Sequence, residues 1–372
     1  MSRESPARPA TESYRSILRD LHAPATVLDL FLAGEAARRT GDHSRAERLF
    51  RQSLQLALKT GDGSAVAMGL WGIATLRRLS GDLDFAMKIY SKAADCAVES
   101  NSPACLAWAR AGCAEIIRHR GQHAVAMNHH VALLESFRNL HDSIGELWAL
   151  QGIGQLYLVN QENGRADSYF RHAQELACKS GDLRALGFSE RALATSARRR
   201  GDMFRARLHL REAQAIFERL EYVVGIGFTI QEMAHCEMVE GNLEEARRLA
   251  QAALIKFGYR YPLGRAWTLA TLAQIESQTG CRSDSTLAES HQIFRKLGVE
   301  VDLSRPQVRY MERIFQSGSV DRHDPAPSPR GLVVSRPDSR QESAAPEAGT
   351  SAGPPVCASG LSGGFQQLEF EN

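Results

Sequence analysis

The chain has 372 residues and a formal net charge of +2 at pH 7, so its overall charge does not favour a polyanionic partner. No run of roughly 18 apolar residues is present, and the polar start lacks the apolar core of a signal peptide. The seven cysteines include no CxxC pair and fit reduced core thiols better than a disulfide framework. We therefore expect a cytoplasmic protein without a membrane span.

Residues 1–22 are polar and contain prolines, and we predict that they are mostly disordered. From residue 23 onward the sequence recurs at a spacing of 40 residues, with a small residue in each of two helix-like segments and a break between them. The three recurring positions are Gly34, Ala74, Ala114, Gly154, Ala194 and Ala234; Gly41, Gly81, Gly121, Gln161, Gly201 and Gly241; and Ala46, Ala86, Ala126, Ala166, Ala206 and Ala246. Small side chains let helices approach closely and glycine suits a left-handed helix end, so each copy is predicted to be a helix pair.

The fourth copy carries a recognisable signature, formed by Ile153, Gly154, Tyr157, Ala166, Phe170 and Ala173. These residues resemble the tetratricopeptide repeat, whose pattern is W-x2-L-G-x2-Y, then G, then A-x3-F-x2-A. The usual repeat has about 34 residues, whereas this spacing resembles the longer-helix variant of kinesin light chains, Pins-type polarity adaptors and bacterial regulators. The resemblance implies an all-α, right-handed superhelical solenoid whose first helices line a concave ligand-binding face.

We predict a solenoid over residues 23–317 and a disordered Pro/Ser/Gly-rich tail over 318–372. The predicted units are repeats at 23–60, 61–100, 101–140, 141–180, 181–220, 221–257 and 258–298, and a capping helix at 304–317. The seventh copy has lost its alanine register, as a terminal unit of a solenoid often does.

The tail ends in FQQLEFEN, whose aromatic residues, acids and free carboxylate resemble a short docking peptide. The candidate docking residues are Phe365, Leu368, Glu369, Phe370, Glu371 and Asn372. A terminus without any binding role is the alternative, and it stays open.

Motifs for catalysis are absent from the sequence: there is no GxGxxG after a strand, P-loop, GxSxG or HExxH. We therefore predict a non-enzymatic protein without a cofactor or metal. A loose group of histidines, His119, His123, His129, His130 and His141, does not share one helical face, and we expect these residues to face solvent or lie in turns.

One face of the predicted first helices combines bulky, polar and basic side chains. The candidate groove residues are Arg38, Arg78, Arg118, Arg198, Arg191, Trp71, Trp108, Trp148, Gln151, Gln155, Phe188, Phe228 and Gln231. Two interpretations stay open for the arginines: they interact with negative helix ends, worth about 0.3–1 kcal/mol each, or they form a ladder that binds carboxylates. The bulky residues, likewise, either wedge between repeats or contact a ligand.

These patterns predict a non-enzymatic adaptor or scaffold that binds an acidic and apolar partner peptide in the concave groove. A tail linker of about 45 residues spans roughly 35–40 Å on average, so the C-terminal peptide is expected to reach the groove and inhibit partner binding. The alternative is a regulatory sensor that responds to a small ligand or signalling peptide and acts through another, transcriptional or enzymatic, chain. RNA binding is less favoured because the net charge is small, and the oligomeric state is left open.

Overall fold

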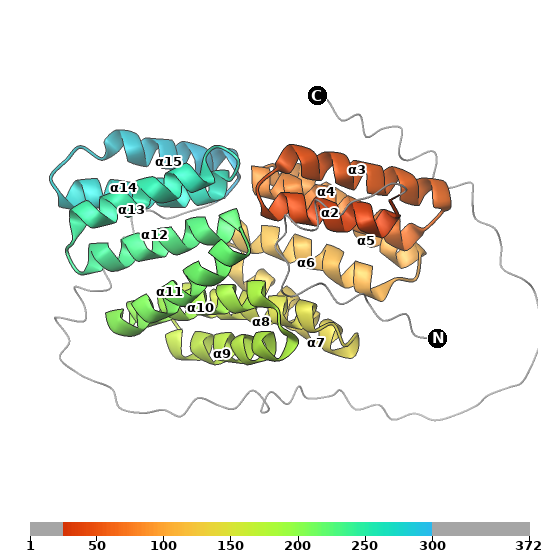
Figure 1. Ribbon diagram of the computed structural model, residues 1–372, viewed down its shortest axis with the longest axis horizontal. Coiled ribbons are helices and arrows are strands. Elements are labelled where there is room, and N and C mark those ends of the chain that lie inside the picture. The colour runs from red at the N-terminus through yellow and green to blue at the C-terminus, as the bar shows by residue number, and fades with distance from the viewer. Residues whose placement is uncertain (1–24, 300–372) are drawn as a thin grey trace, which may run out of the picture. The chain divides into compact units, whose positions relative to one another are not determined.

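The computed structural model describes residues 25–299, which form fourteen α-helices arranged as seven consecutive pairs (Figure 1). The helices are α2 (Val27–Arg39), α3 (His43–Thr60), α4 (Gly63–Ser80), α5 (Leu83–Glu99), α6 (Pro103–His119), α7 (His123–Asn139), α8 (Ser143–Val159), α9 (Asn163–Ser180), α10 (Leu183–Arg199), α11 (Met203–Arg219), α12 (Val223–Val239), α13 (Leu243–Phe257), α14 (Pro262–Gln278) and α15 (Asp284–Lys296). The predicted all-α architecture of repeated helix pairs is confirmed. Each pair is called a repeat below, from repeat one (α2 and α3) to repeat seven (α14 and α15).

Several predicted segments lie outside the described residues. They are the N-terminal segment 1–22, the capping helix at 304–317 and the tail 318–372 with its docking residues. Within the described range, none of the helices is both long enough and apolar enough to cross a membrane.

The turn inside each repeat contains a left-handed residue, and in repeats one, two and five the following aspartate caps the second helix. In repeat two, Gly81 has φ +94°, and the next residue, Asp82, accepts a hydrogen bond from the Phe85 backbone N–H at 3.2 Å. In repeat four, Gln161 takes the same place with φ +65°. Because L-residues rarely adopt this conformation, the glycine column has a conformational cause, and an aspartate cap adds about 1 kcal/mol.

The small column of the first helices has a packing cause. A Cβ atom at Gly154 would lie 2.5 Å from Cε1 of Phe170, and one at Gly34 would lie 2.7 Å from Cε1 of Phe50. Both phenylalanine rings belong to the second helix of the same repeat and are fully buried. In repeats one and four the two helices therefore pack around an aromatic ring that a larger residue would displace.

Close approach between repeats gives a stability prediction at Gly152. A Cβ atom there would lie 2.2 Å from Cε1 of His130, whereas a Cβ atom at Gly164 would meet nothing within 4 Å. We expect Gly152→Ala to lower the free energy of unfolding by about 1–3 kcal/mol through overpacking. Gly164→Ala is expected to be neutral or to stabilise by up to about 1 kcal/mol, because it only restricts the unfolded chain. Urea unfolding monitored by circular dichroism measures both, and equal midpoints would contradict the prediction.

Candidate functional site

The first helices of the repeats form a continuous inner layer. Each of α2, α4, α6, α8, α10 and α12 contacts the first helix of the next repeat, and the second helices pack against the first helices of their own and the following repeat. The layer also joins distant parts of the chain, because α14 contacts α4. Polar side chains on the inner face of these helices are thereby brought close together.

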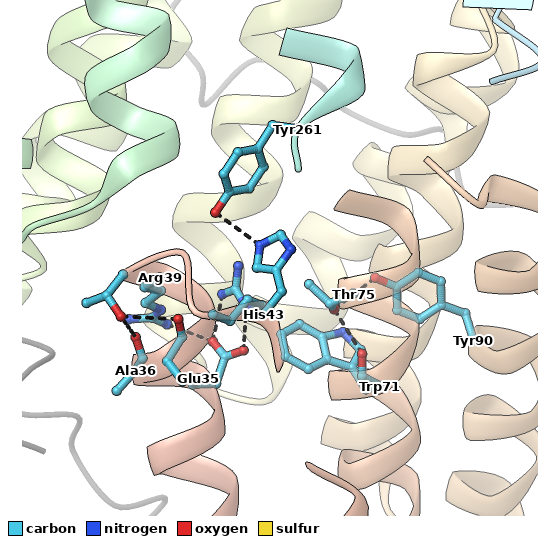
Figure 2. A network of polar contacts seen from close by, with 11 residues as sticks. Glu35, Ala36, Arg39, His43, Trp71, Thr75, Tyr90 and Tyr261 are labelled. Atoms are coloured by element: carbon cyan, nitrogen blue, oxygen red, sulfur yellow. Dashed lines mark hydrogen bonds and ion pairs between the residues drawn. The ribbon is translucent and has the colours of Figure 1, made fainter. Parts of the chain in front are cut away.

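Two of the predicted arginines are paired with a glutamate three residues earlier on the same helix. Arg38 donates to both carboxylate oxygens of Glu35, from Nε at 2.7 Å and from Nη2 at 2.8 Å. Arg39 adds a contact of 3.1 Å to the same carboxylate (Figure 2). In repeat three, Arg118 binds Glu115 at 2.8 Å. These side chains thus have internal partners within the fold.

A third predicted arginine is paired across two repeats. Arg198 on α10 donates from Nε to Oε1 of Glu232 on α12 at 2.6 Å, and the two side chains are only 10% and 8% exposed. His235 lies 3.3 Å from the other oxygen of Glu232. This contact ties repeat five to repeat six inside the inner layer.

The paired glutamates are held in their ionised form. Burial alone would raise the pKa of Glu115, but Arg118 and His119 beside it hold the pKa well below its ordinary value. The same balance applies to Glu232, where Arg198 outweighs the effect of burial and the pKa is again strongly lowered. The contacts are therefore ion pairs at neutral pH.

Two arginines of the inner layer, Arg78 and Arg191, form no ion pair among the described residues, although Glu115 and Glu232 attract them at longer range. The Nε atoms of Arg78 and Arg191 are inaccessible to solvent and have no hydrogen-bond partner within the described range. The guanidinium group of Arg78 lies beside Tyr90, while that of Arg191 lies 5.6 Å from the ring centre of Phe228 and 6.0 Å from that of Phe188. Burial lowers the pKa of Arg191, although Glu232 acts in the opposite direction.

Sequence reasoning missed the glutamates as part of this site. Glu35 and Glu115 carry a local signal, because an acid three residues before an arginine on a helix forms a common surface pair. Glu232 carries none, since its partner is in another repeat. Three of the five predicted arginines, Arg38, Arg118 and Arg198, form ion pairs with Glu35, Glu115 and Glu232. The other two, Arg78 and Arg191, are therefore cations in excess within this group.

The predicted tryptophans lie in contact along repeats two to four. Trp71 and Trp108 meet edge to face with ring centres 6.0 Å apart, and Trp108 and Trp148 follow at 6.4 Å. Trp71 Nε1 donates to the Trp108 carbonyl at 3.0 Å, and Trp108 Nε1 donates to Asp142 of the next repeat at 2.8 Å. The indole N–H groups of Trp71 and Trp108 thus join successive repeats.

Two of the three predicted glutamines also join successive repeats. Gln151 donates to the Ala185 carbonyl at 2.7 Å and Gln231 lies 3.5 Å from the Thr271 hydroxyl, so both bridge to the first helix of the following repeat. Gln155 is partly exposed on the inner layer. Many of the candidate residues therefore lie at junctions between repeats. Arg78 and Arg191 are the predicted arginines that form no ion pair in the described residues.

The expectation that the histidines face solvent or lie in turns was wrong for His130, whose side chain is fully buried. His130 stands at the position that Phe50, Tyr90 and Phe170 occupy in neighbouring repeats, so its ring fills an aromatic core position. His119 is also largely buried, with 13% of its side chain exposed. No group of three or more potential metal ligands is arranged around a common centre in residues 25–299.

The helix pairs and their inner layer define an α-helical solenoid of the tetratricopeptide type. A Rap protein in complex with competence and sporulation factor has a similar structure, with a TM-score of 0.57 and 13% identity over 81% of this chain and 79% of that one. Aspartyl phosphate phosphatase F from Bacillus subtilis is similar with a TM-score of 0.52 and 11% identity over 74% and 73% of the two chains. No protein-family model matches the chain, and no curated protein matches it either. At these identities the similarity establishes a shared fold.

Proposed function

We propose that this protein is a non-enzymatic cytoplasmic adaptor that binds an acid-bearing segment of a partner protein on its inner layer. The observation that carries the proposal is the pair of arginines, Arg78 and Arg191, without a carboxylate partner in the described part of the chain. A buried guanidinium group is costly unless an anion matches it, and a carboxylate matches its planar donor geometry. Phe188 and Phe228 beside Arg191 add an apolar surface for a neighbouring side chain of the ligand.

A second candidate function is a regulatory sensor that changes conformation on binding a small ligand or signalling peptide and acts through another chain. Contacts between α4 and α14 favour this alternative, because they couple repeats that are far apart in the sequence. The Rap protein with a similar fold was crystallised with competence and sporulation factor. Both candidate functions place the ligand on the same inner layer. An adaptor holds its partner there, whereas a sensor changes conformation when the ligand binds.

The C-terminal peptide of this chain is a candidate competitor for that layer. FQQLEFEN combines two acids and two aromatic residues, which match the excess cations and the neighbouring phenylalanines. We propose that it occupies the inner layer in the absence of a partner. A chain shortened to end at Pro355 is then expected to bind an acidic partner peptide more tightly than the full chain does.

Fluorescence anisotropy with a labelled FQQLEFEN peptide tests the proposal on the chain that ends at Pro355. Replacing both Arg78 and Arg191 with glutamine should weaken binding at least about tenfold, because it removes the only unmatched cations of the group described here. The matched control replaces Arg171 and Arg211, which are exposed, with glutamine and changes the net charge equally. Equal affinity of the two double variants, with helicity intact, would show that the inner arginines do not bind the ligand.

A further inference from the structure

Repeat one contacts the loop that leads into repeat seven. His43, the first residue of α3, lies with Nε2 3.0 Å from the Tyr261 hydroxyl, and the two rings meet edge to face (Figure 2). Arg260 donates from Nη1 to the Gly41 carbonyl at 2.9 Å. Because the pKa of His43 is lowered to about 4 by burial and by Arg38 and Arg260, the ring is neutral at pH 7 and its Nε2 is able to accept from the tyrosine.

Repeat two contacts the other side of repeat seven. A Cβ atom at Gly81 would lie 2.3 Å from Cδ2 of Leu297 and 3.0 Å from Cγ of Pro262. The turn at Gly81 therefore lies so close to α14 and the end of α15 that a side chain at this position would collide with them. Next to this contact lies a cleft of about 430 Å³, lined by Asp82, Leu297 and neighbouring residues.

These contacts are unlike the interfaces between successive repeats. The equivalent turn glycines Gly201 and Gly241 would meet nothing within 4 Å if they carried a Cβ atom. Successive repeats are also linked covalently and pack along whole helices. The first repeats meet the later ones through turns and helix ends, where Ala36 and Leu79 join a core cluster with Tyr222 and Tyr261, and an open cleft lies beside this contact. Contacts of this kind are the first to open in a protein whose stability varies along the chain.

We propose that Gly41, His43 and Gly81 form a latch with Arg260, Tyr261 and Leu297, and that opening of this latch admits the ligand to the inner layer. The second part of the proposal depends on the function proposed above, since it concerns the same arginines. Arg38 and Arg78 lie on α2 and α4, which carry one side of the latch, and Arg191 lies on α10. A ligand that neutralises Arg78 and Arg191 together joins repeat two to repeat five, which draws the first repeats toward the later ones and thereby favours the closed latch.

Glutamine is a suitable replacement for the turn glycines, because the chain itself has Gln161 in a left-handed turn. Gly81→Gln places a side chain against Leu297, while Gly201→Gln makes the same replacement at a turn with free space. In the full chain, hydrogen exchange measured by mass spectrometry should be at least tenfold faster for Gly81→Gln in residues 258–264 and 293–299, and unchanged for Gly201→Gln. Tyr261→Phe, which keeps the ring and removes the hydroxyl, should accelerate exchange in the same segments.

Equal exchange in the Gly81 and Gly201 variants would overturn the latch. Access to the inner layer is measured separately, as the association rate of labelled FQQLEFEN with the chain that ends at Pro355. This rate should rise at least threefold for Gly81→Gln, and an unchanged rate together with faster exchange would overturn the latch as a gate. Absence of peptide binding in every variant would count against the proposed function, while the exchange contrast would still decide whether the latch exists.

Discussion

Replacing Glu232 with leucine is expected to lower the free energy of unfolding by about 3–5 kcal/mol. The side chain lies 2.6 Å from Arg198, and both partners are almost fully buried between α10 and α12. Leucine has a similar size but leaves the Arg198 guanidinium group without its anion in a site that is largely closed to water. An uncompensated buried charge costs far more than the loss of an ordinary hydrogen bond.

The control for this prediction is Glu245→Leu. Glu245 pairs with Arg248 three residues later on α13, but the two side chains are 43% and 68% exposed. Exposed pairs contribute little because water solvates the remaining partner, so the control is expected to lose less than about 1 kcal/mol. Urea unfolding monitored by circular dichroism gives both midpoints, and a similar midpoint for the two variants would contradict the buried ion pair.

The difference between buried and exposed ion pairs affects how substitutions of the predicted groove arginines are interpreted. Reversing the charge of Arg118 or Arg198 would break an internal ion pair, so loss of ligand binding in such a variant would reflect damage to the fold. Arg78 and Arg191 form no ion pair within residues 25–299 that their replacement would break. A change of binding on their replacement therefore reports on the ligand.

The repeat architecture could be predicted because it depends on local rules. A left-handed turn residue and a small residue in the first helix recur every 40 residues, and both are visible in the sequence. The pairing of Arg198 with Glu232 could not be predicted, since it depends on how one repeat is rotated against the next. His43 and Tyr261 are 218 residues apart, and their contact depends on the sum of all the rotations between them.

The burial of His130 was missed in the sequence for a different reason. The sequence analysis placed His130 with the other histidines because the group shares no helical face. Its position in the repeat is that of Phe50, Tyr90 and Phe170, and the structure places it face to face with Trp148 at 4.7 Å. Position within the repeat therefore predicts burial better than residue type does.

Acidification from pH 7 to pH 5 is expected to destabilise the protein, with about 2 kcal/mol attributable to His130. Burial, together with Arg118, lowers the pKa of His130 from its ordinary value of 6.5 to about 4, although Glu115 acts in the opposite direction. Between these two values the unfolded chain binds the proton and the folded chain does not. The free energy of unfolding therefore falls as the pH drops below 6.5 and stops falling on this account near pH 4.

A neighbouring residue gives the matched control for this pH dependence. His130→Leu should reduce the difference in urea midpoint between pH 7 and pH 5, because a leucine at the aromatic position has no proton to bind. His129→Leu removes an exposed histidine from the same helix and should keep the wild-type difference. Burial of His119 lowers its pKa to about 3, so acid should still destabilise the His130 variant to some extent. An equal pH response of the two leucine variants would mean that His130 remains solvated in the folded protein, which its complete burial against Trp148 and Gly152 contradicts.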